Sequence, residues 1–282
     1  MSPASTSALA DVACLLACPE CGQALQVQER ALRCARGHSF DIAKQGYVGL
    51  LTGASTKMTG DTADMLDARA AFQRGGHFTP IADAVAAALP TGAATLLEVG
   101  AGTGYYLARA LDAVPRATGI ALDVAKPAAR RCARAHPRAA AVLADAWRGL
   151  PVRDGVLDAV LTVFAPRNPA EAARVLAPDG RYLVVTPTPA HLRELVGPLG
   201  MVGVDPDKDR RVATAMAGHF DPAERVVVEY PMALGRADIA QLVGMGPSAH
   251  HRDDTDAARL AALPDRMSVT ASVTLAVYRP RH

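Results

Sequence analysis

At 282 residues, with half of them apolar and 21% charged, the chain is long enough to bury a hydrophobic core and too apolar to be intrinsically disordered. A net charge of +2 at pH 7 neither requires nor excludes a nucleic acid partner. No apolar run reaches the roughly 18 residues of a membrane-spanning helix, and the first residues lack the basic start of a signal peptide. We therefore expect a cytoplasmic protein without a membrane partner.

The N-terminal segment carries a metal-binding motif. Residues 1–13 are rich in Ser and Ala, and we expect them to be frayed or loosely helical. Beyond them, Cys18 and Cys21 have C-x2-C spacing, and Cys34 and His38 have C-x3-H spacing. Three thiolates and an imidazole at these spacings can close a tetrahedral site. The chain has five cysteines, an odd number, and four of them lie in the first 34 residues, which indicates a metal rather than disulfides. We predict one Zn²⁺ bound by these four side chains.

The segment between the two cysteine turns predicts a β-hairpin. Residues 24–27 and 31–33 alternate between apolar and polar side chains, which is typical of a zinc ribbon. A DNA-binding finger needs a continuous helix that carries the last two ligands, and Gly37 between Cys34 and His38 disfavours it. Cys14 is a rival fourth ligand, but the apolar run around it predicts a buried free thiol. Cys132 is also expected to be a packed thiol.

Two helices are predicted after the ribbon. Glycine- and threonine-rich sequence from residue 51 predicts a linker, and residues 61–73 then show helical periodicity. Thr79-Pro80 is predicted to start a second helix that continues from Ile81 to Leu89, because Pro is well tolerated in the first helical turn.

A glycine-rich loop follows the strand predicted over 94–99. Glycines at 100, 102 and 104 allow tight turns and close approach to a ligand. The dinucleotide fingerprint would place its third glycine at 105, where this chain has Tyr, and the carboxylate of Glu98 would repel a phosphate but suits an ammonium group. The segment 98–104, Glu-x-Gly-x-Gly-x-Gly, resembles motif I of the class I S-adenosylmethionine (SAM) methyltransferases, whose loop holds the methionine part of the cofactor. That resemblance assigns the following residues to the cofactor: Glu98, Gly100, Ala101, Gly102, Gly104, Tyr105 and Tyr106.

Strands and helices then alternate, which predicts an α/β fold with a doubly wound parallel sheet. Strands are expected near 117–122, 139–144, 156–163 and 181–186, helices near 104–113, 126–135, 169–176 and 190–197, and a closing antiparallel pair near 226–230 and 272–278. Residues 201–220 are expected to form a loop and a helix.

Two further acids follow predicted strands. Asp123 comes about 20 residues after the glycine loop, where a carboxylate can accept both ribose hydroxyls of an adenosine. Asp145 lies where class I methyltransferases hold the adenine amino group. Each could instead cap a helix, but three acids at three strand ends favour a cofactor site. Phe164, Arg167 and Asn168 follow the fourth strand and are candidates for the acceptor pocket.

Several segments together resemble the RlmA family of zinc-containing 23S rRNA guanine-N1 methyltransferases, over nearly the whole chain. These are residues 18–22, 37–48, 76–80, 98–106 and Met245-Gly246-Pro247. The resemblance implies methyl transfer from SAM to N1 of a guanine in a domain II hairpin of 23S rRNA, and it includes macrolide-resistance members. It also implies cofactor contacts at Phe78, where the family more often has Tyr, and at His191.

On this interpretation, residues 14–50 form a zinc-ribbon RNA-recognition module, 51–75 a linker and helix, and 76–282 the SAM-dependent methyltransferase domain. Arg30, Arg33, Arg36 and Lys44 would contact RNA phosphates. A carboxylate, His250 or His251 could accept the N1 proton, and the sequence does not choose among them. A homodimer is compatible with the sequence. The alternatives are a small-molecule SAM methyltransferase with a structural ribbon, which predicts a closed apolar pocket, and a non-catalytic zinc-ribbon RNA-binding protein.

Overall fold

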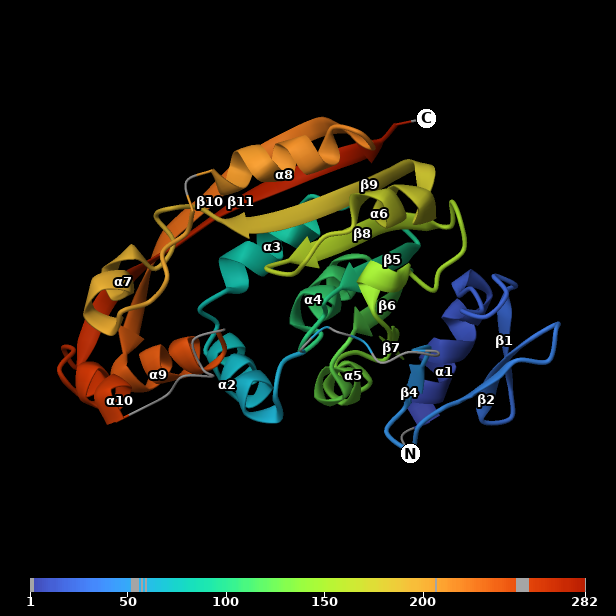
Figure 1. Ribbon diagram of the computed structural model, residues 1–282, viewed down its shortest axis with the longest axis horizontal. Coiled ribbons are helices and arrows are strands. Elements are labelled where there is room, and N and C mark those ends of the chain that lie inside the picture. The colour runs from blue at the N-terminus through green and yellow to red at the C-terminus, as the bar shows by residue number, and fades with distance from the viewer. Residues whose placement is uncertain are drawn as a thin grey trace.

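The computed structural model describes residues 3–51, 56, 58, 60–205, 207–246 and 254–281, with only the backbone described for 3–7 and 254–256. Within these residues, eight strands form one sheet: β4 (Tyr47–Gly49), β5 (Thr95–Val99), β6 (Thr118–Asp123), β7 (Ala139–Leu143), β8 (Leu157–Val163), β9 (Leu176–Pro187), β10 (Phe220–Gly235) and β11 (Arg266–Pro280). Their spatial order is β10, β11, β9, β8, β5, β6, β7, β4 (Figure 1).

The sheet has a parallel part and an antiparallel part. Strands β4 to β9 pair in parallel, and β11 pairs antiparallel with both β9 and β10. This confirms the predicted doubly wound α/β fold with a closing antiparallel pair. That pair is much longer than the expected 226–230 and 272–278, because its pairing runs from Phe220 opposite Pro280 to Gly235 opposite Arg266.

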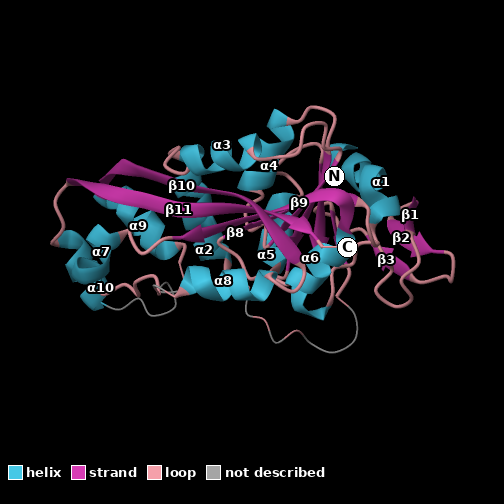
Figure 2. Cartoon of the chain, turned by 90° about the horizontal axis from the view of Figure 1, so that it is seen from above, coloured by secondary structure: helices cyan, strands magenta, loops and turns pink. Residues whose placement is uncertain are grey.

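Helices cover both faces of the sheet (Figure 2). The predicted connections are present as α3 (Thr79–Ala87), α4 (Tyr105–Ala113), α5 (Lys126–Cys132), α6 (Pro169–Val175) and α7 (Arg193–Leu199). Neighbouring residues of a strand point to opposite faces, so Leu96 and Leu97 of β5 belong to two different hydrophobic cores. Burial on both faces explains why the central strands are continuous apolar runs.

The two cores bring together different helices. The core around Leu96 includes α3, α4 and α9 (Arg236–Gly244). The core around Leu97 includes α1 (Pro3–Val12), α6 and α8 (Lys208–Met216), the last of which was predicted only loosely. No sequence pattern predicted α9 or α10 (Asp254–Ala261), which lie with α7 at the opposite end of the molecule from the ribbon (Figure 1).

Of the two alternatives for the N-terminal residues, the helical one is correct. Residues 3–12 form α1, whose Leu9 and Val12 are fully buried beside β6 and β7. The expectation for the first thiol was wrong. Cys14 is exposed rather than buried. It lies in the short 3-10 helix η1 (Ala13–Leu15), where Ala13 and the following Leu16 take the buried positions, so the thiol faces solvent.

The ribbon is a small sheet joined to the large one. The predicted hairpin is confirmed as β1 (Leu25–Gln28) and β2 (Ala31–Cys34), and β3 (Ser39–Asp41) pairs with β2. The chain then enters the main sheet as β4, whose Val48 lies opposite Val142 of β7. The helix α2 (Ala63–Arg74) follows, capped by the Thr62 hydroxyl. No helix among the described residues is long and apolar enough to cross a membrane.

Candidate functional site

The predicted zinc ligands converge in the ribbon. The ligand atoms of Cys18, Cys21, Cys34 and His38 all lie within 4.8 Å of one another. His38 Nδ1 is 3.5 Å from Cys18 Sγ and 3.3 Å from Cys34 Sγ, and Cys21 Sγ is 3.7 Å from Cys34 Sγ. Ligands about 2.0–2.3 Å from a tetrahedral zinc ion lie roughly 3.3–3.8 Å apart, so this donor set fits Zn²⁺.

A cavity of about 660 Å³ lies at the carboxyl ends of β5, β6, β7 and β8. Parallel sheets bind ligands at this edge, near the point where the strand order reverses. Eight of the predicted cofactor residues line it: Phe78, Glu98, Gly100, Ala101, Tyr106, Asp123, Asp145 and His191. The cavity therefore brings together residues from five segments of the chain.

Three predicted cofactor residues lie outside the cavity lining. The Gly102 N–H donates to Asp123 Oδ2 at 2.8 Å and thereby positions that carboxylate. Gly104 precedes α4 in a left-handed conformation. The Tyr105 hydroxyl lies 3.4 Å from Thr79 Oγ1, on the side of α3. Gly102 and Gly104 thus shape the loop, and Tyr105 points toward a neighbouring helix.

Glu98 is a buried acid at the end of β5. Its Oε2 accepts a hydrogen bond from the Leu107 N–H at 3.0 Å, and its side chain is almost completely shielded from solvent. Burial raises the pKa of Glu98 to about 8, an effect that the nearby Arg69 charge partly opposes. A cationic ligand group beside this carboxyl would restore its ionised form.

Asp123 and Asp145 have different surroundings. Asp123 accepts from the Gly102 and Ala125 N–H groups, each at 2.8 Å, and burial raises its pKa. Asp145 accepts from the Trp147 N–H at 3.0 Å and from the Thr56 hydroxyl at 2.6 Å. Asp145 therefore has two positions at once: it is the N-cap of the 3-10 helix η2 (Ala146–Arg148), and it lines the cavity.

His191 is held as a neutral ring. Its Nδ1 accepts a hydrogen bond from the Ser272 N–H at 3.1 Å, which requires the proton of the neutral imidazole to be on Nε2. Burial lowers the pKa of His191 to about 4. The ring stacks on Phe164 with a centroid distance of 5.8 Å and an interplanar angle of 27°. His191 lines the cavity, and the proton on its Nε2 can be donated to a ligand.

Phe164 is the acceptor-pocket candidate that does line the cavity. It is 40% exposed and has a φ of 54°, a left-handed conformation that is unusual for a bulky residue and is often found at functional sites. The next residue, Ala165, packs so close to Gly100 that a Cβ at Gly100 would lie 2.6 Å from the Ala165 Cβ. The turn after β8 therefore contacts the glycine loop directly.

The other two acceptor-pocket candidates do not line the cavity. Asn168 caps α6 through its Oδ1, and its Nδ2 donates to the Ala146 carbonyl at 3.0 Å. The Arg167 guanidinium lies 3.4 Å from the Ala165 carbonyl. Both side chains support the loops around the cavity.

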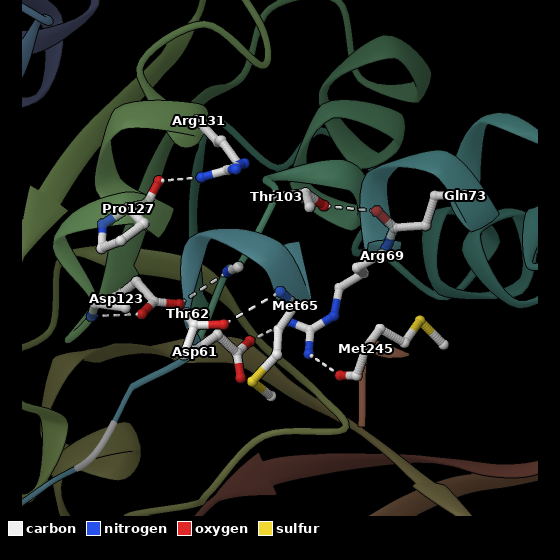
Figure 3. Close-up of polar contacts among 12 residues, drawn as sticks. Asp61, Thr62, Met65, Arg69, Gln73, Thr103, Asp123, Pro127, Arg131 and Met245 are labelled. Atoms are coloured by element: carbon white, nitrogen blue, oxygen red, sulfur yellow. Dashed lines mark hydrogen bonds and ion pairs between the residues drawn. The ribbon is translucent and has the colours of Figure 1, made fainter. Parts of the chain in front are cut away.

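Sequence reasoning missed the wall formed by α2 and its preceding segment. Met58, Gly60, Asp61, Met65, Arg69 and Gln73 line the cavity, as do Leu242, Met245 and Gly246 at the end of the neighbouring α9. Figure 3 shows that Arg69 joins the two parts: it pairs with Asp61 at 2.5 Å and donates to the Met245 carbonyl at 3.0 Å. A basic residue four positions after Met65, on the apolar face of a predicted helix, was the available signal.

The Tyr106 hydroxyl oxygen is buried and has no hydrogen-bond partner. In the described part of the chain it is the one buried side-chain polar atom of which this is true. An unsatisfied buried hydroxyl costs about 1–3 kcal/mol, so its position in the cavity indicates a polar ligand group. Arg69 is the one Lys or Arg among the described cavity residues, and its charge acts on Tyr106, Glu98 and Asp123. These groups fit the zwitterionic methionine end of SAM.

Three residues named from the sequence, Pro247, His250 and His251, lie outside the described residues.

Comparison with family models matches two parts of the chain. Residues 16–55 match the zinc ribbon described as RlmA, N-terminal, and residues 96–180 match a methyltransferase domain. The two matches correspond to the metal cluster and to the strands that form the cavity.

Two curated relatives match over almost their full length. A Micromonospora griseorubida protein named for 23S rRNA guanine-N1 methylation is 50% identical, covering 94% of this chain and 97% of its own. The 23S rRNA (guanine(748)-N(1))-methyltransferase of Streptomyces fradiae is 45% identical, covering 94% and 96%. Among solved structures, the complex of the Haloferax volcanii Trm112 methyltransferase activator with a methyltransferase contains a chain with a TM-score of 0.51 at 19% identity. That match covers 80% of this chain and 100% of the other, and supports the fold.

Proposed function

Because the chain belongs to the RlmA-type family of 23S rRNA (guanine-N1)-methyltransferases, we propose that it methylates N1 of a guanine in a domain II hairpin of 23S rRNA, with SAM as the methyl donor. The observation that supports this most directly is 50% and 45% identity to two relatives with this named activity, over 94% of the chain. Similarity of that extent includes both the ribbon and the cavity.

The cavity suggests how SAM would lie. The Glu98 carboxylate is suited to the ammonium group, while the Arg69 guanidinium and the Tyr106 hydroxyl can bind the carboxylate of the methionine part. Asp123, held by two backbone N–H groups, has lone pairs left for the ribose hydroxyls. Asp145 remains the residue for the adenine amino group.

Bound SAM supplies an activated methyl group, so the protein mainly has to hold guanine N1 in line with it. The turn at Phe164 and Ala165 lies against the glycine loop and can place a base there. His191 does not serve as the base in this state, because its Nδ1 is occupied and its Nε2 carries the proton. Its role would be to donate a hydrogen bond and orient a ligand.

The two alternative functions make different demands. The cavity walls are rich in Met, Phe and Leu side chains, as expected of a small-molecule methyltransferase. A second cavity, lined by Cys18, Arg148 and Arg174, lies between the ribbon and the main sheet, as expected if RNA binds across both modules. The identity to the two relatives favours the rRNA substrate. A non-catalytic RNA-binding protein would not need the acids at 98, 123 and 145, which all line the cavity.

Three finer predictions belong to this proposal. We infer that the protein acts in the cytoplasm, where its thiols stay reduced and available for zinc. Methylation of this guanine would serve as protection against macrolides, as in the macrolide-resistance members that the chain resembles. A homodimer stays a prediction of the sequence analysis.

Primer extension tests the proposal, because a methyl group on N1 blocks Watson–Crick pairing and stops reverse transcriptase. Unmethylated 23S rRNA incubated with the protein and SAM should give a stop at one domain II guanine. Asp123→Ala should remove that stop, since the ribose would lose charge-assisted hydrogen bonds. A wild-type protein that binds SAM yet produces no stop on 23S rRNA would contradict the proposed substrate.

A further inference from the structure

Trp147 is the chain's only tryptophan and is unusually exposed for a cavity residue. The residue is 54% exposed, whereas Phe78 and Tyr106, which line the same cavity, are 3% and 6% exposed. Phe164, at 40%, resembles Trp147 in this respect. The cavity therefore has an inner pair of buried aromatic rings and an outer pair that faces solvent.

The backbone around Trp147 is firmly held although its side chain is exposed. The Trp147 N–H donates to Asp145 Oδ1 and the Arg148 N–H donates to the Asp145 carbonyl, both at 3.0 Å. Asn168 Nδ2 donates to the Ala146 carbonyl at 3.0 Å and ties η2 to the start of α6. An aromatic ring on a fixed backbone loses little conformational entropy when it binds a partner.

Trp147 also lies where two cavities meet. The second cavity, about 380 Å³, shares Ala144 and Asp145 with the cofactor cavity and reaches Cys18, Pro19 and Gly22 in the first cysteine turn of the ribbon. The exposed Arg148 lines this second cavity directly beside Trp147. Trp147 thus lines the cofactor cavity, and its neighbour Arg148 lines the adjoining cavity that reaches Cys18.

We propose that Trp147 stacks on an unpaired nucleobase of the RNA substrate, at the junction between the ribbon and the cofactor cavity. This inference rests on the proposed function and adds a recognition residue to it. Unpaired loop bases are recognised mainly by stacking on aromatic side chains, with basic residues on the neighbouring phosphates, and Trp147 and Arg148 offer both groups side by side.

The rival ligand for Trp147 is the adenine of SAM, because Asp145 is only two residues away. Exposure favours RNA: a small cofactor in the inner cavity would be enclosed by the buried rings, while a ring that is more than half exposed suits a large ligand arriving from solvent. The two ligands make opposite predictions for a Trp147 variant.

Tryptophan fluorescence tests the proposal without any added label, since Trp147 is the only source of the signal. The probes are a synthetic domain II hairpin and the same stem closed by a short, stable tetraloop. The domain II hairpin should quench the emission in a saturable way. The tetraloop control should quench it much less at equal concentration.

Trp147→Ala should weaken binding of the domain II hairpin roughly 5- to 150-fold, the range measured for loss of one base–aromatic stack. Trp147→Phe keeps an aromatic face and should lose less. Val227→Ala, at a 55% exposed apolar residue on the outer strand β10, is the control and should change nothing. SAM affinity, measured by calorimetry, should be the same in all of these proteins.

Two results would overturn the inference. Unchanged hairpin affinity and methylation in Trp147→Ala would show that the ring is not a recognition residue. A loss of SAM affinity with hairpin binding intact would show that it covers adenine. If the wild-type protein itself neither binds nor methylates the hairpin, the proposed function fails as well, so the two failures are distinguishable.

Discussion

At the scale of single residues, the cavity contains two buried polar groups, Glu98 and the Tyr106 hydroxyl, whose state should change when a ligand binds. Glu98 is an acid that burial keeps protonated up to about pH 8. Tyr106 has a buried hydroxyl without a partner in the described chain. Both groups face a cavity beside Arg69, and each gives a prediction that separates ligand binding from stability.

SAM binding should release about one proton at pH 7, because the ammonium group favours the ionised form of Glu98. Affinity should therefore rise with pH below about 8, by up to about tenfold per unit. Without SAM the sign is reversed: the folded chain should lose stability as the pH rises from 4.5 to about 8, since Glu98 ionises first in the unfolded chain. Calorimetry in buffers of different ionisation enthalpy measures the proton release.

Glu98→Gln should abolish this proton release and weaken SAM binding. The matched control is Asp83→Asn, which alters an exposed carboxylate paired with Arg109. Proton release that persists in Glu98→Gln would assign it to another group. The measurements belong between about pH 6 and 7.5, because an α-amino group itself titrates near 7.7–8.0.

Tyr106→Phe should make the SAM-free protein more stable and bind SAM more weakly. Removing an unsatisfied buried hydroxyl relieves a cost of about 1–3 kcal/mol, while the same hydroxyl is lost to the ligand. Tyr182→Phe is the contrasting control, because the Tyr182 hydroxyl lies 3.0 Å from Thr162 Oγ1 and its removal leaves that buried group unpaired. Thermal unfolding and SAM titration measure both effects. Lower stability in Tyr106→Phe would show that the hydroxyl has a partner in the free protein.

At the scale of elements, the cavity depends on contact between the glycine loop and the turn after β8. Gly100 and Gly92 both have left-handed backbones, with φ of 72° and 78°, but a Cβ would meet Ala165 at 2.6 Å in the first case and nothing within 4 Å in the second. Substituting Gly92 therefore tests backbone strain alone, whereas substituting Gly100 tests the same strain together with displacement of the turn after β8.

Gly100→Ala and Gly92→Ala should each cost about 1–2 kcal/mol of stability from the left-handed backbone. Only Gly100→Ala should also lower SAM affinity and methylation, because its Cβ displaces the turn that carries Phe164. Unfolding curves and methylation assays on both variants test this. The prediction is wrong if the two variants have equal SAM affinity and equal methylation activity at saturating SAM and RNA. The position of the turn after β8 would then not depend on Gly100.

At the scale of the whole molecule, the ribbon and the methyltransferase sheet share a hydrophobic core. Leu25 and Leu32 of the ribbon belong to the same buried cluster as Leu9 of α1 and Val142 of β7. The metal ligands Cys18 and Cys34 are part of that cluster. Because β4 also pairs with β7, the structure predicts that ribbon and sheet unfold together.

Cys34→Ser should therefore lose zinc and lower the Tm of the whole chain in a single transition. A destabilisation of about 3 kcal/mol would lower Tm by roughly 6–12 °C for a domain of this size. Cys14→Ser is the control, since Cys14 is exposed and outside the metal cluster, and it should keep both zinc and Tm. Elemental analysis and differential scanning calorimetry give the two measurements. A separate low-temperature transition with an unchanged main one would show that the ribbon folds independently.

The sequence alone determined those features that depend on neighbouring residues. Ligand spacing identified Cys18, Cys21, Cys34 and His38, because a cysteine turn is a local structure. Apolar runs separated by helical periodicity identified the central strands, and the glycines and acids at their ends located the cavity, since parallel strands place their carboxyl ends on one edge.

Tertiary structure decided what depends on distant parts of the chain. Arg69 meets the carbonyl of Met245, 176 positions away, and no local pattern encodes such a contact. In the short apolar run around Cys14, either the thiol or the side chains of Ala13 and Leu16 can face the core. The sequence of the run does not distinguish the two orientations. The three residues of β4 are too few for a periodic signal, and they form a strand because β7 offers a free edge. Trp147 became a recognition candidate only when folding placed it in the cofactor cavity, next to Arg148 in the second cavity that reaches the cysteine turn.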